Sequence, residues 1–377
     1  NQKNSYHNQK KIFINPNLKI DSIEFENLIT KKNINPDHIY INKIFNYKLA
    51  NQASLLDSLN KNKINFKFTD NNLLIKKGDY KIINNIIVPV DIQTKIEKGT
   101  IFNMSKNISI LFQGNLNAKG SKEEKILVNA INTNEPFGTF AVVGKNYKSN
   151  VNLSNFIIEG GSEASLAGMV FLGQLSLHNS NVSIIDSKIS KSYSDDGANI
   201  RNSNIDILNT SFSFNKFDQL DLDFCNGSLI NNKFIINSNQ PNESNGGDGI
   251  DLSGSNILIS NNQIKNLTDK GISVGEKSKA LISENEFIKN NIAIAIKDES
   301  QIYDVNNNFI DNTLNFSLYV KKKFFKEPIL YLNDPNQSKK ITTQDFEILD
   351  GKIILIEQSN KLKFYNEFKN EIIASRI

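Results

Sequence analysis

The amino-acid sequence predicts an all-β fold, a right-handed parallel β-helix built as a single solenoid with about 22 residues per coil. Three observations lead to this prediction. Short β-branched runs alternate with Asn, Gly and Ser turns from about residue 73 to about residue 320, one register position recurs at a nearly fixed interval, and a second position recurs in step with it. An N-terminal helical cap and a C-terminal closing element complete the expected fold.

The first repeated position stands at the start of one strand in each coil. Its steps are 22, 30, 22 and 22 residues, and its members are Asp196, Asp218, Asp248, Lys270 and Ile292. The second position is apolar, with steps of 22, 30, 23 and 22 residues, and its members are Phe212, Phe234, Ile264, Phe287 and Phe309. This period suits one turn of a parallel β-helix, whose coils lie about 4.8 Å apart, as neighbouring strands do. A leucine-rich repeat would need Leu at fixed spacings followed by Asn or Cys, and the sequence lacks that consensus.

Polar turn residues recur with the same steps. Two positions before each apolar member stand Thr210, Asn232, Asn262, Asn285 and Asn307, which predicts a stack of side-chain amides from coil to coil. The one longer step contains eight extra residues, and they fall within the segment 235–247, directly before Asp248. Such insertions form loops on one face of a solenoid, often the binding face.

The solenoid needs protection at both ends, because an open edge strand exposes unpaired backbone groups. We expect residues 1–72 to form a linker and cap, residues 73–320 to form the β-helix, and residues 321–377 to form a C-terminal cap. In the cap, one helical face would carry Leu49, Ala53, Leu56 and Leu59. The chain begins at Asn1 rather than Met, so we expect further sequence before it.

Composition excludes several function classes. The net charge is +4 and no long block of one sign occurs, which argues against a nucleic-acid partner. The single cysteine, Cys225, excludes an internal disulfide framework and a Cys-based zinc site. Three dispersed histidines share no ligand spacing, and no apolar run approaches the roughly 20 residues that span a bilayer. We expect a monomer without a transmembrane segment.

Parallel stacking predicts three rows of polar side chains on the outer face of one sheet. The first row contains Asp196, Asp218, Asp248 and Lys270, the second Asn199, Asp221 and Asp251, and the third Arg201, Asp223, Ser253 and Lys297. Apolar rows should alternate with them, because successive side chains of a strand point to opposite faces. The charges are therefore expected outside and the apolar rows in the core. Carboxylates at this spacing repel one another, which raises their pKa values unless a cation intervenes.

The short segments GGDGIDLSGS, DKGISVGEKS and AIAIKDES in successive coils resemble the polygalacturonases of the pectate lyase and polygalacturonase-like superfamily. In that resemblance, Asp218 and Asp248 match acid-bearing coils, the Gly271, Ser273 and Gly275 pattern matches a glycine-serine motif, and Ile296-Lys297 matches an Ile-Lys pair. The chain departs from the family at three positions: Lys270 stands where a His is expected, Ala295 where an Arg is expected, and Gly247 where one of two paired Asp residues is expected. The resemblance covers about four coils.

Lyases of the same superfold use a Lys or Arg base together with calcium held by Asp residues, and SDDG, FDQLDLD and Lys270 resemble that arrangement. The resemblance therefore implies Lys270, Asp248 and Asp218 as catalytic residues, and Asp251, Lys297 and Arg201 as substrate contacts. A divalent cation, Ca²⁺, would be held by carboxylates, which suit a hard ion with six to eight oxygen ligands, and the candidates are Asp196, Asp218, Asp221, Asp223 and Asp248.

Two classes of function remain open at this point. The first is an exported enzyme, extracellular, periplasmic or on the cell surface, that acts on an acidic polysaccharide as a lyase, epimerase or hydrolase. The second is a non-catalytic surface module that binds a glycan or serves a structural role, because a fold alone does not establish activity. In that second case the Asp residues are solvated turn and surface groups.

Overall fold

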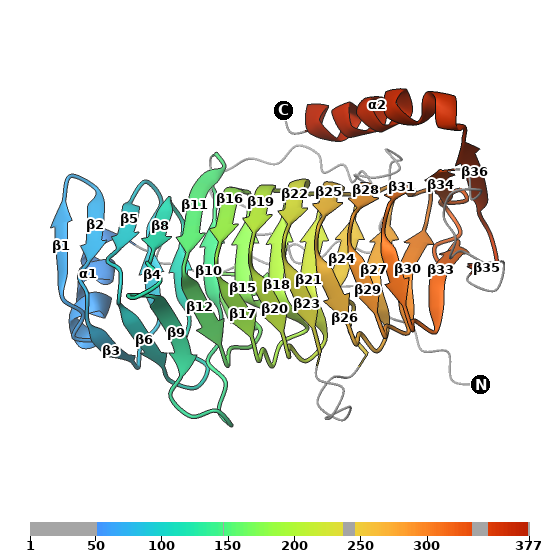
Figure 1. The fold of residues 1–377 in the computed structure, drawn as a ribbon. Helices are drawn as coiled ribbons and strands as arrows, with labels where there is room; N and C mark the ends of the chain where they lie inside the picture. Colours follow the sequence, from blue (N-terminus) through green and yellow to red (C-terminus); the bar gives the residue numbers. More distant parts are fainter. Residues whose placement is uncertain (1–50, 146, 237–245, 334–345, 376–377) are drawn as a thin grey trace, which may run out of the picture.

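The computed structural model describes residues 51–145, 147–236, 246–333 and 346–375. Its chain winds in coils around one apolar core, and the strands of successive coils form three long parallel sheets (Figure 1). The predicted parallel β-helix is therefore confirmed.

Each full coil contributes one strand to each sheet. The 13-stranded sheet contains, in spatial order, β1 (Phe66–Thr69), β2 (Asn72–Ile75), β5 (Gln93–Ile96), β8 (Leu116–Lys119), β11 (Ser149–Ser154), β16 (Ser180–Ile185), β19 (Asn204–Leu208), β22 (Asn226–Ile230), β25 (Asn256–Ser260), β28 (Lys279–Ser283), β31 (Gln301–Val305), β34 (Ile329–Asn333) and β36 (Lys352–Ile356). The 11-stranded sheet contains β4 (Ile86–Val88), β7 (Ile110–Phe112), β10 (Phe140–Val143), β15 (Gly173–His178), β18 (Asp196–Arg201), β21 (Asp218–Asp223), β24 (Ile250–Ser253), β27 (Lys270–Gly275), β30 (Ile292–Lys297), β33 (Leu314–Tyr319) and β35 (Phe346–Ile348). The 10-stranded sheet contains β3 (Asp79–Ile82), β6 (Ile101–Met104), β9 (Ile126–Ala130), β12 (Phe156–Glu159), β17 (Lys188–Ser190), β20 (Ser211–Ser213), β23 (Lys233–Ile235), β26 (Gln263–Lys265), β29 (Glu286–Ile288) and β32 (Asn308–Ile310).

Among the described residues, antiparallel pairing between strands occurs at two places, and one isolated antiparallel bridge joins Asn132 and Glu135. Strands β1 and β2 pair antiparallel at the N-terminal end, and β13 (Ala164–Leu166) and β14 (Met169–Phe171) form a hairpin. The hairpin packs Phe171 against Leu111 and Ala141, on the outer face of the 11-stranded sheet.

The strand register follows the steps that the repeat predicts. Asp196 pairs with Asp218 in β18 and β21, and Lys270 pairs with Ile292 in β27 and β30. The longer step is absorbed between β21 and β24, where Leu220 pairs with Ile250. The second position forms an unbroken buried row from Phe212 to Phe287, with the Phe212 and Phe234 rings stacked at 5.0 Å. Most of the inserted loop lies outside the described residues.

A ladder of buried asparagines joins the coils at the turn between the 13- and 10-stranded sheets. The Oδ1 atom of Asn262 accepts the backbone N–H of Asn232 at 2.7 Å, and Asn285 and Asn307 accept from the preceding coil in the same way. Each amide also donates to a carbonyl of the preceding coil, as Asn262 does to Leu229 at 3.0 Å. Asn307 donates to the buried Asp304 carboxyl at 2.6 Å. The predicted amide stack therefore satisfies backbone groups that turns would otherwise leave unpaired.

Helices lie at the two ends of the described chain. Helix α1 (Gln52–Lys61) begins at Asn51, whose side chain and that of Ser54 form a capping box. Of the expected face, α1 buries Leu59, while Leu56 is half-buried, Ala53 is exposed and Leu49 lies outside the described residues. Its second buried residue is Leu55, which was not expected on that face.

At the C-terminal end, the parallel sheet continues past residue 320 through β34 and β36. The short 3-10 helix η3 (Gln358–Asn360) then leads into α2 (Lys361–Ala374), which turns back along the outer face of the 13-stranded sheet (Figure 1). Helix α2 buries Phe368 and Ile372 against Leu281 and Tyr303. Within the described residues, neither helix has the length and apolar character needed to cross a membrane.

The asparagine ladder makes a testable contribution to stability. Replacing Asn262 by Ala leaves the buried N–H of Asn232 and the carbonyl of Leu229 without their partners, so we expect a loss of about 2 to 4 kcal/mol in the free energy of unfolding. Asn181→Ala is the matched control, because Asn181 belongs to an exposed amide stack on β16, and its loss should stay below about 0.5 kcal/mol. Urea denaturation of both variants measures the difference, and equal losses would contradict the assigned role of the ladder.

Candidate functional site

The candidate site lies on the 11-stranded sheet, where β18, β21, β24, β27 and β30 carry the predicted polar rows. Strand pairing places Asn199, Asp221, Asp251 and Ser273 side by side, and likewise Arg201, Asp223, Ser253 and Gly275. The first row is held by hydrogen bonds rather than by proximity alone. Asp218 Oδ1 accepts the backbone N–H of Asp248 at 2.6 Å, and Asp248 Oδ1 accepts the backbone N–H of Lys270 at 3.0 Å.

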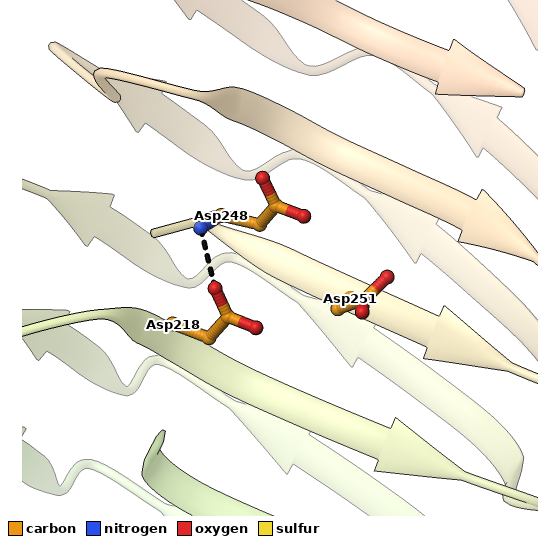
Figure 2. A group of neighbouring side chains, drawn as sticks. All are labelled: Asp218, Asp248 and Asp251. Atoms are coloured by element: carbon orange, nitrogen blue, oxygen red, sulfur yellow. Dashed lines mark hydrogen bonds between the residues drawn. The ribbon is translucent and has the colours of Figure 1, made fainter. Parts of the chain in front are cut away.

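Three carboxylates meet at the centre of these rows (Figure 2). One oxygen each from Asp218, Asp248 and Asp251 lies within 4.8 Å of the other two. We call this set the carboxylate cluster. Asp251 Oδ1 is buried and has no hydrogen-bond partner among the described residues, and its nearest cation is Lys297 Nζ at 3.8 Å.

The charges are more deeply buried than the sequence analysis expects. Asp196 is 4% exposed, Asp248 is 6% exposed and Lys297 is 5% exposed, although the strand pattern places the polar rows on the outer face. The expectation of charges lining an exposed surface is therefore wrong for these three residues. In-register stacking explains part of this burial, because each side chain is covered by its neighbours in the coils above and below.

Burial and mutual repulsion raise the pKa values of the aspartates. Burial, together with the charges of Asp218 and Asp195, raises the pKa of Asp196 to about 9. Burial and the charge of Asp248 raise the pKa of Asp218 to about 8. Burial also raises the pKa of Asp248, to about 6, and the Lys270 ammonium group limits this increase. At neutral pH the face therefore contains both protonated and ionised carboxyl groups.

The remaining acidic residues of the rows have their own partners. Burial and the nearby Asp196 charge hold the pKa of Asp221 well above its ordinary value, and Asp221 accepts a hydrogen bond from Asn199 Nδ2 at 2.6 Å. Burial also raises the pKa of Asp223, against the opposing charge of Arg201, whose Nε lies 2.7 Å from Asp223 Oδ2. Arg201 thus lies in the third row and contacts its neighbour Asp223 rather than the carboxylate cluster.

Lys270 is held in ion pairs. Its Nζ atom lies 3.2 Å from Asp248 Oδ1 and 2.5 Å from Asp269 Oδ2. Burial lowers the pKa of this amine, but the two carboxylates outweigh that effect and the pKa is raised overall. The sequence analysis missed Asp269, although the residue directly precedes Lys270 and could have been considered as its partner.

Lys297 reaches the carboxylate cluster from two coils away. Lys297 lies on β30 and Asp251 on β24, with β27 between them. Gly275 of β27 makes room for this path, because a Cβ atom there would lie 3.3 Å from Lys297 Cε. Burial lowers the pKa of Lys297, but the Asp251 charge raises it overall, so the amine stays charged.

Two further residues define the edges of the site. Gly247 packs so closely on the preceding coil that a Cβ atom would lie 1.9 Å from the carbonyl carbon of Phe217. An Asp at this position, as the resemblance implies, would therefore not fit this backbone. His178 Nε2 lies 3.0 Å from Asn199 Oδ1, and burial lowers the pKa of the imidazole to about 4. His178 was not predicted as a site residue, because the three histidines share no ligand spacing in the sequence. Stacking of the coils is what brings it to Asn199.

The sequence model of the family described as "Right handed beta helix region" matches residues 173–368. None of the curated proteins matches the chain in sequence. Among solved structures, the chain is similar to the full-length tailspike protein 2 from Escherichia coli O157:H7 bacteriophage CAB120, with 13% identity, a TM-score of 0.47, and coverage of 71% of this chain and 42% of the tailspike. The chain thus spans less than half the length of that protein.

Two further solved structures cover the chain more fully. The periplasmic alginate epimerase AlgG is 13% identical with a TM-score of 0.44, covering 82% of this chain and 82% of the epimerase. The mannuronan C-5 epimerase AlgE4 A-module of Azotobacter vinelandii is 10% identical with a TM-score of 0.42, covering 81% of this chain and 93% of the module.

The raised carboxyl pKa values predict how stability depends on pH. A carboxyl group whose pKa is raised on folding contributes stability that is fully present below its unfolded value, near 4, and is lost as pH rises through the folded value. For Asp196 this loss extends from about pH 4 to about pH 9, at up to about 1.4 kcal/mol per pH unit. We expect Asp196→Asn to raise the melting temperature at pH 8 and to flatten the pH dependence, with little change at pH 4.

The control for this measurement is Asp57→Asn, because Asp57 lies on α1 with a largely exposed side chain. Its melting temperature should follow that of the wild type across the pH range. Thermal melts of the three proteins from pH 4 to pH 9 give the comparison. A wild-type protein that becomes steadily more stable up to pH 9, with Asp196→Asn less stable throughout, would contradict the buried carboxyl assignment.

Proposed function

The chain belongs to the right-handed β-helix family, and from this premise we propose that it binds and acts on an acidic polysaccharide along the outer face of the 11-stranded sheet. The observation that carries the proposal is the carboxylate cluster of Asp218, Asp248 and Asp251, flanked by the ammonium groups of the half-buried Lys270 and the buried Lys297. A parallel β-helix offers a long rigid face on which an extended chain of sugars can lie across successive coils. Polysaccharides of this kind suit a protein exported to the periplasm, the cell surface or the exterior.

Two carboxyl groups of the cluster differ in protonation near neutral pH. Burial and the charge of Asp248 raise the pKa of Asp218 and favour its protonated form, whereas the Lys270 ammonium group, 3.2 Å from Asp248, favours the ionised form of Asp248. A protonated and an ionised carboxyl group side by side are the acid and the base that glycoside hydrolysis requires. In this role Asp218 donates a proton to the leaving glycosidic oxygen while the Asp248 carboxylate attacks the anomeric carbon, because one oxygen of each group lies within 4.8 Å of the other. Water would then hydrolyse the glycosyl-enzyme bond, with Asp218 accepting the proton of that water.

The basic residues and Asp251 would hold the substrate. The Lys297 ammonium group lies 3.8 Å from Asp251, and its side chain is only 6% exposed, so it would attract a sugar carboxylate bound at the carboxylate cluster through its charge rather than by an exposed contact. Arg201 lies farther along the same face, with its side chain 37% exposed, and offers a guanidinium group for a second anionic group of the polymer. Asp251 would accept hydrogen bonds from sugar hydroxyl groups.

The same donors fit a divalent cation. Carboxylate oxygens are the ligands that Ca²⁺ prefers, and the unpartnered Oδ1 of Asp251 is a buried oxygen that a cation would satisfy. Asp218, Asp248 and Asp251 would hold the ion directly, and the unpartnered Oδ2 of Asp196 makes that residue a further ligand candidate. Asp221 and Asp223, whose pKa values are raised without an ion, would contribute negative charge once a bound cation favours their ionised forms. Bound calcium would neutralise the carboxylates and attract the acid groups of the polymer.

Calcium would also change the role of Lys270. In the ion-paired arrangement the amine stays protonated, so it cannot accept a proton. Neutralisation of Asp248 would weaken this pairing and lower the pKa of the amine, which is the condition for a base that removes the proton beside a uronate carboxyl group. Calcium-dependent elimination or epimerisation by Lys270 is therefore the second candidate reaction. A non-catalytic glycan-binding module is the third candidate, and the ion pairs of Lys270 favour it over the lyase when calcium is absent.

An assay of products separates these candidates. Purified protein is incubated with a panel of uronic-acid polymers, with calcium or with a chelator, and both reducing ends and the absorbance of unsaturated products are followed. We expect reducing ends without unsaturation for the acid and base pair, and Asp218→Asn should lower the rate by at least about 100-fold, because a general acid contributes about that factor or more. The exposed Asp57→Asn variant should keep the full rate.

Lys270→Ala then identifies the reaction class. If reducing ends appear without unsaturation, this variant should keep part of the activity, whereas an unsaturated product that requires calcium and disappears in Lys270→Ala would identify the lyase instead. An epimerase would give neither readout, so the recovered polymer is also checked by ¹H NMR for a changed configuration at C5 of its uronic acids. Binding of polymer without chain cleavage, unsaturation or such a change supports the non-catalytic module. Absence of both binding and products across the panel would contradict the proposed function.

A further inference from the structure

A second polar depression lies at the rim of the same sheet, outside the carboxylate cluster. It has a volume of about 300 Å³, and its lining residues are Glu163, Leu172, Tyr193, Asp195, Lys216 and Phe217. Three of these residues each stand directly before a strand: Leu172 before β15, Asp195 before β18 and Phe217 before β21. Asp195 is adjacent in sequence to Asp196, and Phe217 is adjacent to Asp218. The depression therefore begins one residue from the predicted acidic row.

Aromatic rings form one side of this depression. Tyr193 is 42% exposed, and its hydroxyl group donates a hydrogen bond to the Thr133 carbonyl at 2.6 Å. This hydrogen bond fixes the ring while much of the side chain stays open to solvent. The backbone of Phe217 is likewise fixed, because Gly247 of the next coil packs directly on its carbonyl group. The Tyr193 ring is thus held in place before any ligand binds, which lowers the entropy cost of stacking a sugar ring on it.

The polar groups of the depression have unused hydrogen-bonding capacity. Lys216 Nζ lies 5.2 Å from the centre of the Phe217 ring, and within the described residues no carboxylate lies within ion-pair distance of it. Glu163 accepts a hydrogen bond from Ser162 at 3.1 Å, and in the part of the chain that the structure describes no donor is assigned to its other carboxylate oxygen or to the carboxylate of Asp195. An ammonium donor and carboxylate acceptors around a ring surface suit a ligand rich in hydroxyl groups.

The balance of charge separates this depression from the carboxylate cluster. Two carboxylates, Glu163 and Asp195, face a single ammonium group on Lys216, so the lining repels an additional anion. A sugar acid would be disfavoured here, whereas a neutral sugar ring would place its C–H face on the aromatic side chains and its hydroxyl groups on the charged groups.

We propose that this depression is a subsite for a neutral pyranose residue, and that the polymer handled by the protein therefore places a neutral sugar next to an acidic one. The inference rests on the proposed function, because the acidic unit would occupy the adjacent carboxylate cluster. It narrows the substrate class from acidic polysaccharides in general to heteropolymers with alternating acidic and neutral units. Specificity for a polymer of alternating acidic and neutral sugars would arise because two sites of different charge lie side by side on one rigid face.

Calorimetric binding measurements test the subsite. Oligosaccharides of matched length are compared in two sets: homopolymers of uronic acid, and heteropolymers in which a uronic acid alternates with a neutral hexose or N-acetylhexosamine. Wild-type protein should bind at least one heteropolymer about tenfold or more tightly than the homopolymers. Tyr193→Ala and Lys216→Met should each weaken heteropolymer binding about tenfold, a loss of about 1.4 kcal/mol, and leave homopolymer binding unchanged.

Matched controls keep the result interpretable. Tyr147→Ala removes a 52% exposed tyrosine elsewhere on the surface, and Lys233→Met removes an exposed lysine on the 10-stranded sheet, and neither should change affinity. If homopolymers bind as tightly as heteropolymers, or if Tyr193→Ala and Lys216→Met bind as the wild type does, the subsite is overturned while the proposed function stands. If the wild type binds no acidic oligosaccharide of either set, both proposals fail.

Discussion

The constraint on which this molecule depends is the in-register pairing of parallel strands from one coil to the next. Each coil hydrogen-bonds to its neighbours at a spacing of about 4.8 Å, so residues that share a register position lie side by side in adjacent coils. Where the sequence repeats a residue type at that position, like side chains are therefore neighbours. For Phe212 and Phe234, or for Asn262 and Asn285, this repetition is favourable, because rings stack and amides hydrogen-bond along the row. For Asp218 and Asp248 the same repetition forces like charges together and raises their pKa values.

Stacking of a repeated aspartate therefore places carboxylates close enough to repel one another, and this repulsion can be relieved in two ways. Protons can neutralise part of the row, which leaves an acid and a base in contact, or a divalent cation can neutralise it, which leaves a binding site for anionic sugars. Lys270 and Lys297 reduce the repulsion between the aspartates without removing it, since each contacts an aspartate of another coil on the same face. Protonation of some carboxyl groups would favour hydrolysis by an acid and a base, whereas a bound cation would favour elimination or epimerisation by Lys270.

The sequence could predict the coils and the rows, because their steps of 22 and 30 residues are visible in the order of residues alone. It could not predict the burial of Asp196 and Lys297, since strand alternation gives the face on which a side chain lies and not how deeply its neighbours cover it. The ion pair of Lys270 with Asp269 was overlooked, and the close approach of Gly247 to Phe217 depends on how the backbone leaves the longer turn. The rim depression is lined by residues of three turns, and no sequence pattern within any one of these turns predicts it.

The central claim is that stacking keeps some carboxyl groups of this face protonated at neutral pH when no cation is bound. The most direct test is to label the aspartates with ¹³C and follow their carboxyl resonances from pH 3 to pH 10 in the presence of a chelator, with Asp196→Asn and Asp218→Asn used for assignment. The account predicts resonances that titrate between about pH 6 and about pH 9 and that are lost or shifted in these two variants. Titration of every aspartate below pH 5 would contradict it.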